Sequence, residues 1–137
     1  MSKMTGGCLC GRVRYVVTGE PMRSGLCHCR DCQRYTGSAF EPWLLLATNQ
    51  VSLHGDMKTF GMTGGSGQVI HRRFCVNCGS GVVNEVDVLP GAIIVLAGTL
   101  DDPTVFVPTV EIYCSAAQPW VNDRRERQRF PMMLPLT

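Results

Sequence analysis

The sequence Cys75-Val76-Asn77-Cys78-Gly79, taken with Cys8-Leu9-Cys10 near the N-terminus, decides the fold that we expect. The two-residue gap of the later pair is the spacing of a zinc knuckle, a tight turn whose backbone N–H groups can hydrogen-bond the sulfurs. In the earlier pair, an extended backbone would point both sulfurs to one face, and Gly11 would let the chain turn away closely behind the metal. We therefore predict one structural zinc ion with four ligands, Cys8, Cys10, Cys75 and Cys78. This ion would tether the first strand to the middle of the chain, and its binding free energy would become folding free energy.

A third cluster, Cys27-His28-Cys29-Arg30-Asp31-Cys32, combines both spacings within six residues. Four thiolates complete the tetrahedron of a structural zinc, whereas three leave one corner where a substrate atom can bind. We predict that Cys27, Cys29 and Cys32 hold a second, more labile zinc ion and form the catalytic site. An ion held by three thiolates favours a soft fourth ligand, and a bound thiol would be deprotonated at neutral pH. The spacing therefore indicates thiol chemistry.

Several alternatives compete with this interpretation. An iron–sulfur cluster or disulfides would also use clustered cysteines. The eighth cysteine, Cys114, is expected to be a buried thiol on one strand face with Val110 and Ile112, but it would close the second site if it were the fourth ligand. His28 should point away from the metal because side chains alternate, and His71 is expected to be an ordinary strand residue.

The composition restricts the class of protein. A chain of 137 residues with 45% hydrophobic content is long enough for one compact domain, which we expect to span residues 1–137. The net charge of +2 is small, and basic residues gather only at Arg124, Arg125, Arg127 and Arg129, which gives nucleic acid binding little support. The N-terminus lacks the apolar core of a signal peptide, and no apolar run approaches the roughly 18 residues of a membrane span. We expect a cytoplasmic protein, in which clustered cysteines are metal ligands more often than disulfides.

Short β-rich runs alternate with turn residues along the chain, which predicts a mostly β domain of several small, strongly bent antiparallel sheets. Fifteen glycines and eight prolines fit the many turns that such a domain needs. The predicted strands cover residues 12–18, 39–47, 51–54, 68–74, 81–86, 92–97 and 109–114. Residues 30–35 and 123–130 are the predicted short helices, because no longer stretch keeps a helical period.

The order of the motifs resembles a known family, that of the glutathione-dependent formaldehyde-activating enzymes, also called the GFA or centromere protein V family. The matching stretches are Gly7-Cys8-Leu9-Cys10-Gly11, Cys27-His28-Cys29-x-x-Cys32, Thr36-Gly37-Ser38-Ala39-Phe40, Arg73-Phe74-Cys75-x-x-Cys78-Gly79-Ser80, Gly98-Thr99-Leu100-Asp101-Asp102-Pro103 and Ala117-Gln118-Pro119-Trp120. The resemblance implies a β-tent fold with a structural zinc on the outer pairs and a second zinc on the middle triplet. It also implies a carbon–sulfur lyase that reversibly joins glutathione and formaldehyde into S-hydroxymethylglutathione.

One position departs from the family pattern. Members that are closest to the formaldehyde enzyme tend to carry a histidine before the Ile-Phe of the late strand, whereas this chain has Glu111-Ile112-Tyr113. The departure leaves the fold intact and puts the substrate in question. The partners expected from the resemblance are a small thiol and an aldehyde, and the sequence leaves open whether the protein assembles as a homodimer.

Residues outside the cysteine clusters supply weaker candidates for substrate contacts. Arg72 or Arg73 could pair with a glutathione carboxylate, although each is first expected to be a solvated strand charge, and Ser38 could donate a hydrogen bond. Trp43 or Trp120 could wall the pocket, although each is first expected to be a packing residue. The pair Asp101-Asp102 before Pro103 predicts a turn. The competing functional class is a non-catalytic zinc-stabilised binding module or a thiol or metal sensor.

Overall fold

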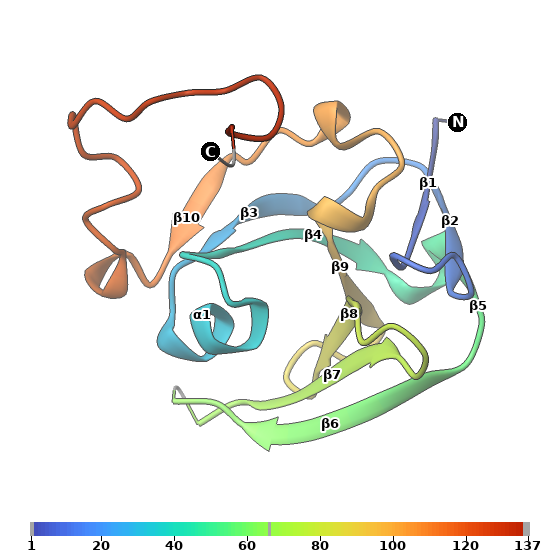
Figure 1. Ribbon diagram of the computed structural model, residues 1–137. Helices are drawn as coiled ribbons and strands as arrows, with labels where there is room; N and C mark the ends of the chain where they lie inside the picture. The colour runs from blue at the N-terminus through green and yellow to red at the C-terminus, as the bar shows by residue number, and fades with distance from the viewer. Residues whose placement is uncertain (1, 66, 136–137) are drawn as a thin grey trace.

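The computed structural model describes residues 2–65 and 67–135, which form two β-sheets and one short α-helix that lies beside the larger sheet (Figure 1). The mostly β fold class predicted from the sequence is confirmed. The strands are β1 (Lys3–Gly7), β2 (Arg14–Thr18), β3 (Arg23–Cys27), β4 (Glu41–Ala47), β5 (Val51–His54), β6 (Met57–Thr63), β7 (Val69–Cys75), β8 (Gly81–Val86), β9 (Ala92–Leu96) and β10 (Val110–Ile112). The helix α1 spans Arg30–Thr36, and short 3-10 turns include η3 (Pro103–Val105) and η4 (Cys114–Ala116).

The strands form a three-stranded sheet with the order β1-β2-β5 and a seven-stranded sheet with the order β10-β3-β4-β9-β8-β7-β6. Among the described strands, each pair is antiparallel except β10 with β3, which is parallel. The parallel pair differs from the antiparallel sheets that we expected. It arises because the long connection after β9 brings the chain back to the sheet edge in the direction of β3.

All seven predicted strands form, with ends shifted by up to two residues. Three further strands, β1, β3 and β6, were not predicted because each carries glycine and charged or polar residues that weaken a strand pattern. Their conformation is fixed by pairing with neighbours, for example over seven consecutive residues between β6 and β7. Tertiary pairing therefore overrides weak local preference in these segments.

One predicted helix forms and the other does not. The prediction for residues 30–35 is confirmed by α1, but the stretch 123–130 has no regular structure, so that prediction was wrong. The physical reason is that most of its side chains are exposed, so a helix there would lack the tertiary packing that stabilises short helices. No helix within residues 2–65 and 67–135 is long and apolar enough to cross a membrane.

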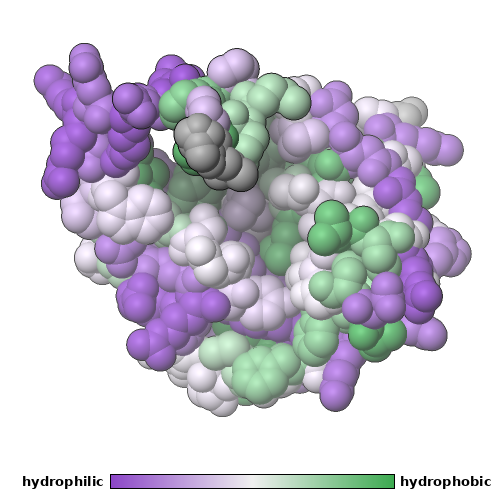
Figure 2. Space-filling view, viewed as in Figure 1, coloured by the Kyte–Doolittle hydropathy of each residue, from purple (hydrophilic) through white to green (hydrophobic). Residues whose placement is uncertain are grey.

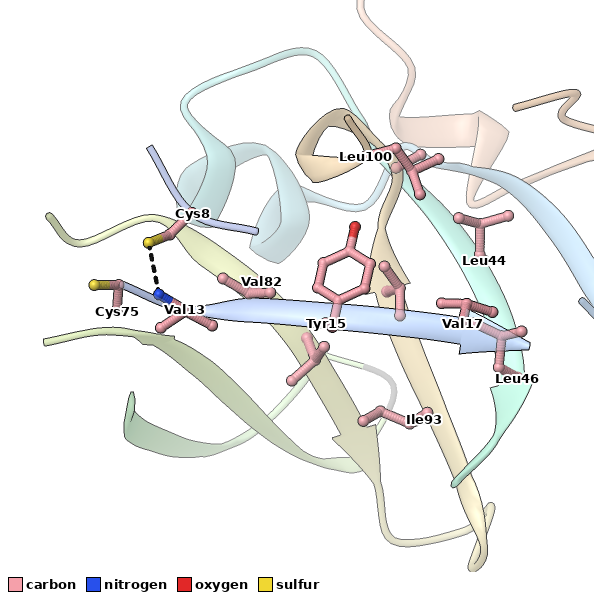
Figure 3. Close-up of a cluster of buried hydrophobic side chains, with 13 residues drawn as sticks. Cys8, Val13, Tyr15, Val17, Leu44, Leu46, Cys75, Val82, Ile93 and Leu100 are labelled. Carbon is pink, nitrogen blue, oxygen red and sulfur yellow. Dashed lines mark hydrogen bonds between the residues drawn. The ribbon is translucent and has the colours of Figure 1, made fainter. Parts of the chain in front are cut away.

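The seven-stranded sheet has a closed face and an open face. Side chains alternate along β4, so Leu44 and Leu46 point to the closed face, where both are almost fully buried. There they meet Tyr15 and Val17 of β2 and Val13, which directly precedes β2, and these side chains belong to the hydrophobic core (Figure 3). The core holds the seven-stranded sheet in place. The strand residues that alternate with the core residues, such as Leu45 in β4, project from the opposite face of this sheet.

The open face carries polar as well as apolar residues. The strand register places Leu45 opposite Ile94, Ile94 opposite Asn84, and Asn84 opposite Arg72, so these four side chains lie in one row across four strands. The helix α1 and the β10 end of the sheet lie beside this face (Figure 1). Figure 2 shows the molecule hollowed near the centre of this view, with the most hydrophilic surface at the upper left over the C-terminal segment.

Candidate metal centres and the adjoining cavity

The two cysteine pairs of the predicted structural site come together in the structure. The Cys8 and Cys10 sulfurs are 3.6 Å apart, and the Cys10 and Cys75 sulfurs are 3.7 Å apart. With Cys78, the four sulfurs all lie within 4.8 Å of one another and could hold a metal ion. A tetrahedral zinc with bonds of about 2.3 Å requires sulfurs roughly 3.8 Å apart, so the donor set and its spacing fit this ion. Their role as zinc ligands stays a prediction.

The local structure around Cys8 and Cys10 differs from the expected extended strand. Strand β1 ends at Gly7, and the two cysteines lie in a turn that is closed by a 3.1 Å hydrogen bond from the Gly11 N–H to the Cys8 carbonyl. Gly11 has φ +83°, a left-handed conformation that glycine adopts without strain. A turn is needed here because β1 and β2 pair as a hairpin, so the sulfurs converge by chain reversal and not by strand alternation.

Backbone N–H groups approach these sulfurs as the knuckle spacing predicts. The N–H of Asn77 donates to the Cys75 sulfur at 3.3 Å, and the N–H of Val13 donates to the Cys8 sulfur at 3.2 Å (Figure 3). The Ser80 hydroxyl lies 3.2 Å from the Cys78 sulfur, and this contact, with backbone N–H groups, lowers the pKa of Cys78 to about 5. These donors stabilise thiolate, the form of cysteine that binds metal.

The second group contains Cys27, Cys29 and Cys32, whose sulfurs also lie within 4.8 Å of one another. Cys27 ends β3, and Cys29 is the N-cap of α1, where its sulfur accepts a 3.3 Å hydrogen bond from the backbone N–H of Cys32. The helix thus begins inside the motif and turns Cys32 back toward the other two sulfurs. Cys27 and Cys32 are buried, while Cys29 is partly exposed.

The chemistry of this donor set favours a cation. The sulfur of Cys27, burial and the negative charge of Glu41 together raise the pKa of Cys32, and burial raises the pKa of Cys29. Three thiols this close cannot all ionise unless a positive charge compensates them. A bound metal ion would supply that charge, so the triplet fits a metal site whose fourth ligand is not a cysteine.

A buried polar network lies directly beneath Cys32. Arg72 donates to Glu41 at 3.1 Å and approaches the Cys32 sulfur at 3.7 Å, while Asn84 donates to both Glu41 oxygens at 3.2 and 3.3 Å. The Arg72 guanidinium also lies 4.5 Å from the centroid of the Tyr35 ring. Burial raises the pKa of Glu41, although Arg72 and Asn84 oppose that change. The network fixes one side of the cysteine triplet.

The expectation for Arg72 was wrong. It is 1% exposed and paired with Glu41, so it is neither a solvated strand charge nor free to bind a glutathione carboxylate. Its neighbour Arg73 points to the other face of the sheet, where it pairs with Glu85 at 3.1 Å. Strand alternation explains why two adjacent arginines have such different surroundings.

The histidines lie outside both cysteine groups. His28 is buried, and its Nε2 lies 2.8 Å from a Glu111 carboxylate oxygen, while its ring packs against Phe40 at 5.7 Å. His28 therefore belongs to neither group of sulfurs, as we expected from alternation, and it is buried and hydrogen-bonded. His71 is partly exposed and lies 2.7 Å from Asp87, in agreement with an ordinary strand position.

Cys114 does not complete the second site. It is exposed and belongs to neither group of sulfurs, so the prediction of a buried thiol was wrong. Strand β10 ends at Ile112, and Tyr113 adopts a left-handed conformation with φ 55° that turns the chain into η4. Cys114 therefore does not share the strand face of Val110 and Ile112.

A cavity of about 600 Å³ adjoins the triplet on the open face of the seven-stranded sheet. All three cysteines of the triplet line it, together with Glu41, Arg72 and Asn84. One rim is a loop after β6, which is tied to α1 by a 2.9 Å hydrogen bond from the Gly65 N–H to Asp31. The other rim includes Ile112 and Tyr113. The arrangement gives a small molecule access to the triplet.

The remaining predicted residues divide between the cavity and the surface. Trp43 lines the cavity, whereas Trp120 is 53% exposed and lies outside it, as does the exposed Ser38. The turn predicted at Asp101-Asp102 is confirmed, because Asp101 pairs with Arg14 and Asp102 caps η3. Trp120 therefore does not wall this cavity, while the substrate contact of Trp43 and the donor role of Ser38 stay predictions.

Sequence reasoning missed several residues that surround the triplet. Glu41 and Asn84 were not singled out, although a carboxylate next to Pro42 and Trp43 in an apolar run is a signal for a buried polar contact. Gln33 was also missed, and it donates to the His28 carbonyl at 2.6 Å and the Ala116 carbonyl at 2.9 Å. Gln33 thereby fastens η4 to the triplet loop. No pattern in the sequence marks that long-range contact.

Comparisons with known proteins agree with this geometry. The sequence model of the family described as "Glutathione-dependent formaldehyde-activating enzyme" matches residues 3–116, and the chain belongs to this family. None of the curated proteins compared with this chain matches it. The crystal structure of a Rhodobacter sphaeroides protein is similar, with a TM-score of 0.59 and 20% sequence identity over 79% of this chain and 98% of that chain. At this identity the likeness concerns the fold alone.

Proposed function

We propose that the protein is a carbon–sulfur lyase that handles adducts of a small thiol, such as glutathione, with an aldehyde, such as formaldehyde. In the forward direction, the thiol sulfur bonds to the carbonyl carbon, the carbonyl π pair moves to oxygen, and the thiol proton ends on that oxygen. The reverse direction breaks the same carbon–sulfur bond. The observation that carries the proposal is a three-cysteine group, without a fourth cysteine, that opens into a cavity.

In this proposal, Cys27, Cys29 and Cys32 hold a zinc ion and form the catalytic site. A zinc ion bound there would supply the positive charge that keeps a substrate thiol deprotonated. The chain itself positions the reactants: Glu41 and Arg72 hold Cys32, Trp43 forms part of a wall, and the α1 contact with Gly65 closes one rim. Holding thiol and aldehyde side by side would supply most of the rate acceleration.

The outer group, Cys8, Cys10, Cys75 and Cys78, is proposed to hold a structural zinc ion. It joins segments 65 residues apart in the chain, and its four cysteines do not line the cavity beside the triplet. A cytoplasmic location is part of the proposal, because a reducing compartment keeps such thiols available for metal. Assembly as a homodimer stays a prediction.

The test is the exchange of ¹³C-formaldehyde between free and glutathione-bound forms, followed by NMR with zinc-loaded protein. We expect the wild type to accelerate the exchange above the spontaneous rate. Cys29→Ser should abolish the acceleration and leave about one zinc per chain, whereas Cys114→Ser should match the wild type because Cys114 lies outside both groups. Full activity of Cys29→Ser would contradict the proposal. Two zinc ions that resist chelation until the domain unfolds, with no turnover of any aldehyde, would support the non-catalytic class.

A further inference from the structure

The cavity is lined by more apolar surface than either glutathione or formaldehyde could contact with apolar groups of its own. Away from the cysteines, large apolar side chains line it, and these are Trp43, Leu45, Ile70, Val86, Leu89, Ile94 and Ile112. Formaldehyde has no hydrocarbon substituent, and glutathione presents two carboxylates and an ammonium group. The apolar wall therefore has no counterpart in either of these molecules.

Four of the apolar residues form two cross-strand pairs on this face of the sheet. Leu45 pairs with Ile94 between β4 and β9, and Ile70 pairs with Val86 between β7 and β8. These four residues lie on four adjacent strands of one sheet face, and three strand spacings of about 4.8 Å make the strip that they form roughly 14 Å wide. The two pairs are offset along the strands, because the residue directly opposite Ile94 is Asn84 and Val86 is two residues further along β8. All four are only partly buried, so they retain surface that a ligand can cover.

The buried charged residues of the cavity are already paired within the protein. Among the described residues that line it, the cationic side chains are Arg30 and Arg72. Arg72 is buried and bound to Glu41, whereas Arg30 is exposed and donates to the neutral side chain of Gln33. Asp31 accepts the Gly65 N–H. The cavity therefore offers no unpaired buried cation that would recognise the carboxylates of glutathione.

Resting on the proposed function, we infer that the preferred adduct carries an apolar substituent beside the reacting carbon–sulfur bond. The substituent lies on the strip of Leu45, Ile94, Val86 and Ile70, while the sulfur lies at the cysteine triplet. The substituent can belong to the aldehyde or to the thiol, because the two molecules are joined at one carbon–sulfur bond and a substituent on either side of that bond lies close to it. The overall reaction is unchanged: a thiol adds across the carbonyl, and its proton ends on the carbonyl oxygen.

The first test is binding of a homologous series of n-alkanethiols, from ethanethiol to hexanethiol, to the zinc-loaded protein. Trp120→Phe leaves Trp43 as the single tryptophan, so its fluorescence reports on the cavity wall. Each methylene transferred to apolar surroundings should raise affinity about fourfold. We expect this slope and weaker binding of glutathione than of hexanethiol. A flat series, or tighter binding of glutathione, would overturn the inference.

Two variants with a matched control locate the substituent. Val86→Phe should occupy the space above the strip, lowering the affinity for hexanethiol at least tenfold while changing the affinity for ethanethiol little. Ile94→Ala should make the affinity depend less on the chain length of the thiol. Val69→Phe adds similar bulk at a position that lies on the opposite face of β7 from Ile70 and outside the cavity, so it should behave as the wild type. An equal effect of Val86→Phe and Val69→Phe would overturn the assignment to the strip.

The second test is turnover in four arms that pair formaldehyde or hexanal with glutathione or hexanethiol. Exchange that is faster with hexanal than with formaldehyde assigns the substituent to the aldehyde. Exchange that is faster with hexanethiol than with glutathione assigns it to the thiol. If formaldehyde with glutathione is the fastest pair, the inference is wrong and the proposed function stands. If no pair reacts, the proposed function fails, and the thiol-binding series still decides whether the strip binds an apolar substituent.

Discussion

Arg72 donates a 3.1 Å hydrogen bond to Glu41 inside the protein, and the same guanidinium lies 3.7 Å from the Cys32 sulfur. Both side chains are nearly inaccessible, at 1% and 5% side-chain exposure. An ion pair in such a place is strongly destabilised when one partner is removed, because the other charge is left buried and unpaired. The candidate site is thus built on a pair whose two members depend on each other.

Arg72→Met should therefore lower the free energy of unfolding by about 3–5 kcal/mol. The double variant Arg72→Met/Glu41→Gln should recover part of this loss, because it removes the uncompensated carboxylate. Urea denaturation of the zinc-loaded proteins measures both. A double variant that is as unstable as the sum of the two single variants would show that the pair does not act as a unit.

Cys78→Ser should unfold the domain or remove its cooperative melting transition. Metal binding at structural sites contributes free energy comparable to the whole stability of a small domain. The measurement is thermal melting together with zinc content, which should fall from two ions to at most one per chain. Cys114→Ser is the matched control, since that thiol is exposed and outside both groups. If Cys78→Ser melts like the control, our assignment of the structural ligands is wrong.

Glu111→Leu should destabilise the protein, because it leaves the buried His28 Nε2 without its partner at 2.8 Å. The expected loss in the free energy of unfolding is about 1–3 kcal/mol, the usual cost of an unsatisfied buried polar group. Glu111→Gln keeps an acceptor at this position and should stay close to the wild type. Denaturation at pH 7 compares the two, and equal losses would show that the hydrogen bond contributes nothing.

Asp31→Ala should loosen the loop that closes one rim of the cavity, because the Gly65 N–H loses its 2.9 Å acceptor. We expect faster hydrogen exchange of the Gly65 amide and a KM several-fold higher, with kcat less affected. Asp31→Asn retains an oxygen acceptor and should exchange more slowly than the alanine variant. Unchanged exchange in Asp31→Ala would show that this contact does not hold the loop.

The ion pair of Arg14 and Asp101 should make the free energy of unfolding depend on pH in the acidic range. The hydrogen bonds from Arg14 and Thr5 lower the pKa of Asp101 to about 2, from an ordinary value near 3.8. Because the folded-state pKa is depressed, this contribution to stability is present above about pH 4 and is lost as the pH falls toward 2. Asp101→Asn should flatten that part of the stability curve, which denaturation from pH 5 to 2 measures. Asp102→Asn, which keeps a cap for η3, serves as the control and should retain the wild-type slope.

Local patterns predicted much of the fold. Short β-rich runs and the turn residues between them identified seven strands, because strand preference and turn chemistry act over a few residues. The segment β3 was missed because its sequence Arg-Ser-Gly-Leu-Cys is a weak strand former, and only pairing with β4 and β10 makes it a strand. The charged segment 123–130 was predicted to be a helix, but it forms none, because most of its side chains are exposed and do not pack against the rest of the protein.

The sequence by itself determined which cysteines group together, because ligand spacing is a property of neighbouring residues and a loop of six residues brings three sulfurs into one place. It also determined the family, through the order of those motifs along the chain. Only the tertiary structure decided what surrounds the sulfurs. Glu41 lies 31 residues from Arg72 and 43 residues from Asn84 in the chain, and strand pairing brings all three together beneath Cys32. The apolar strip has the same origin, since contacts across a sheet depend on pairing between distant segments.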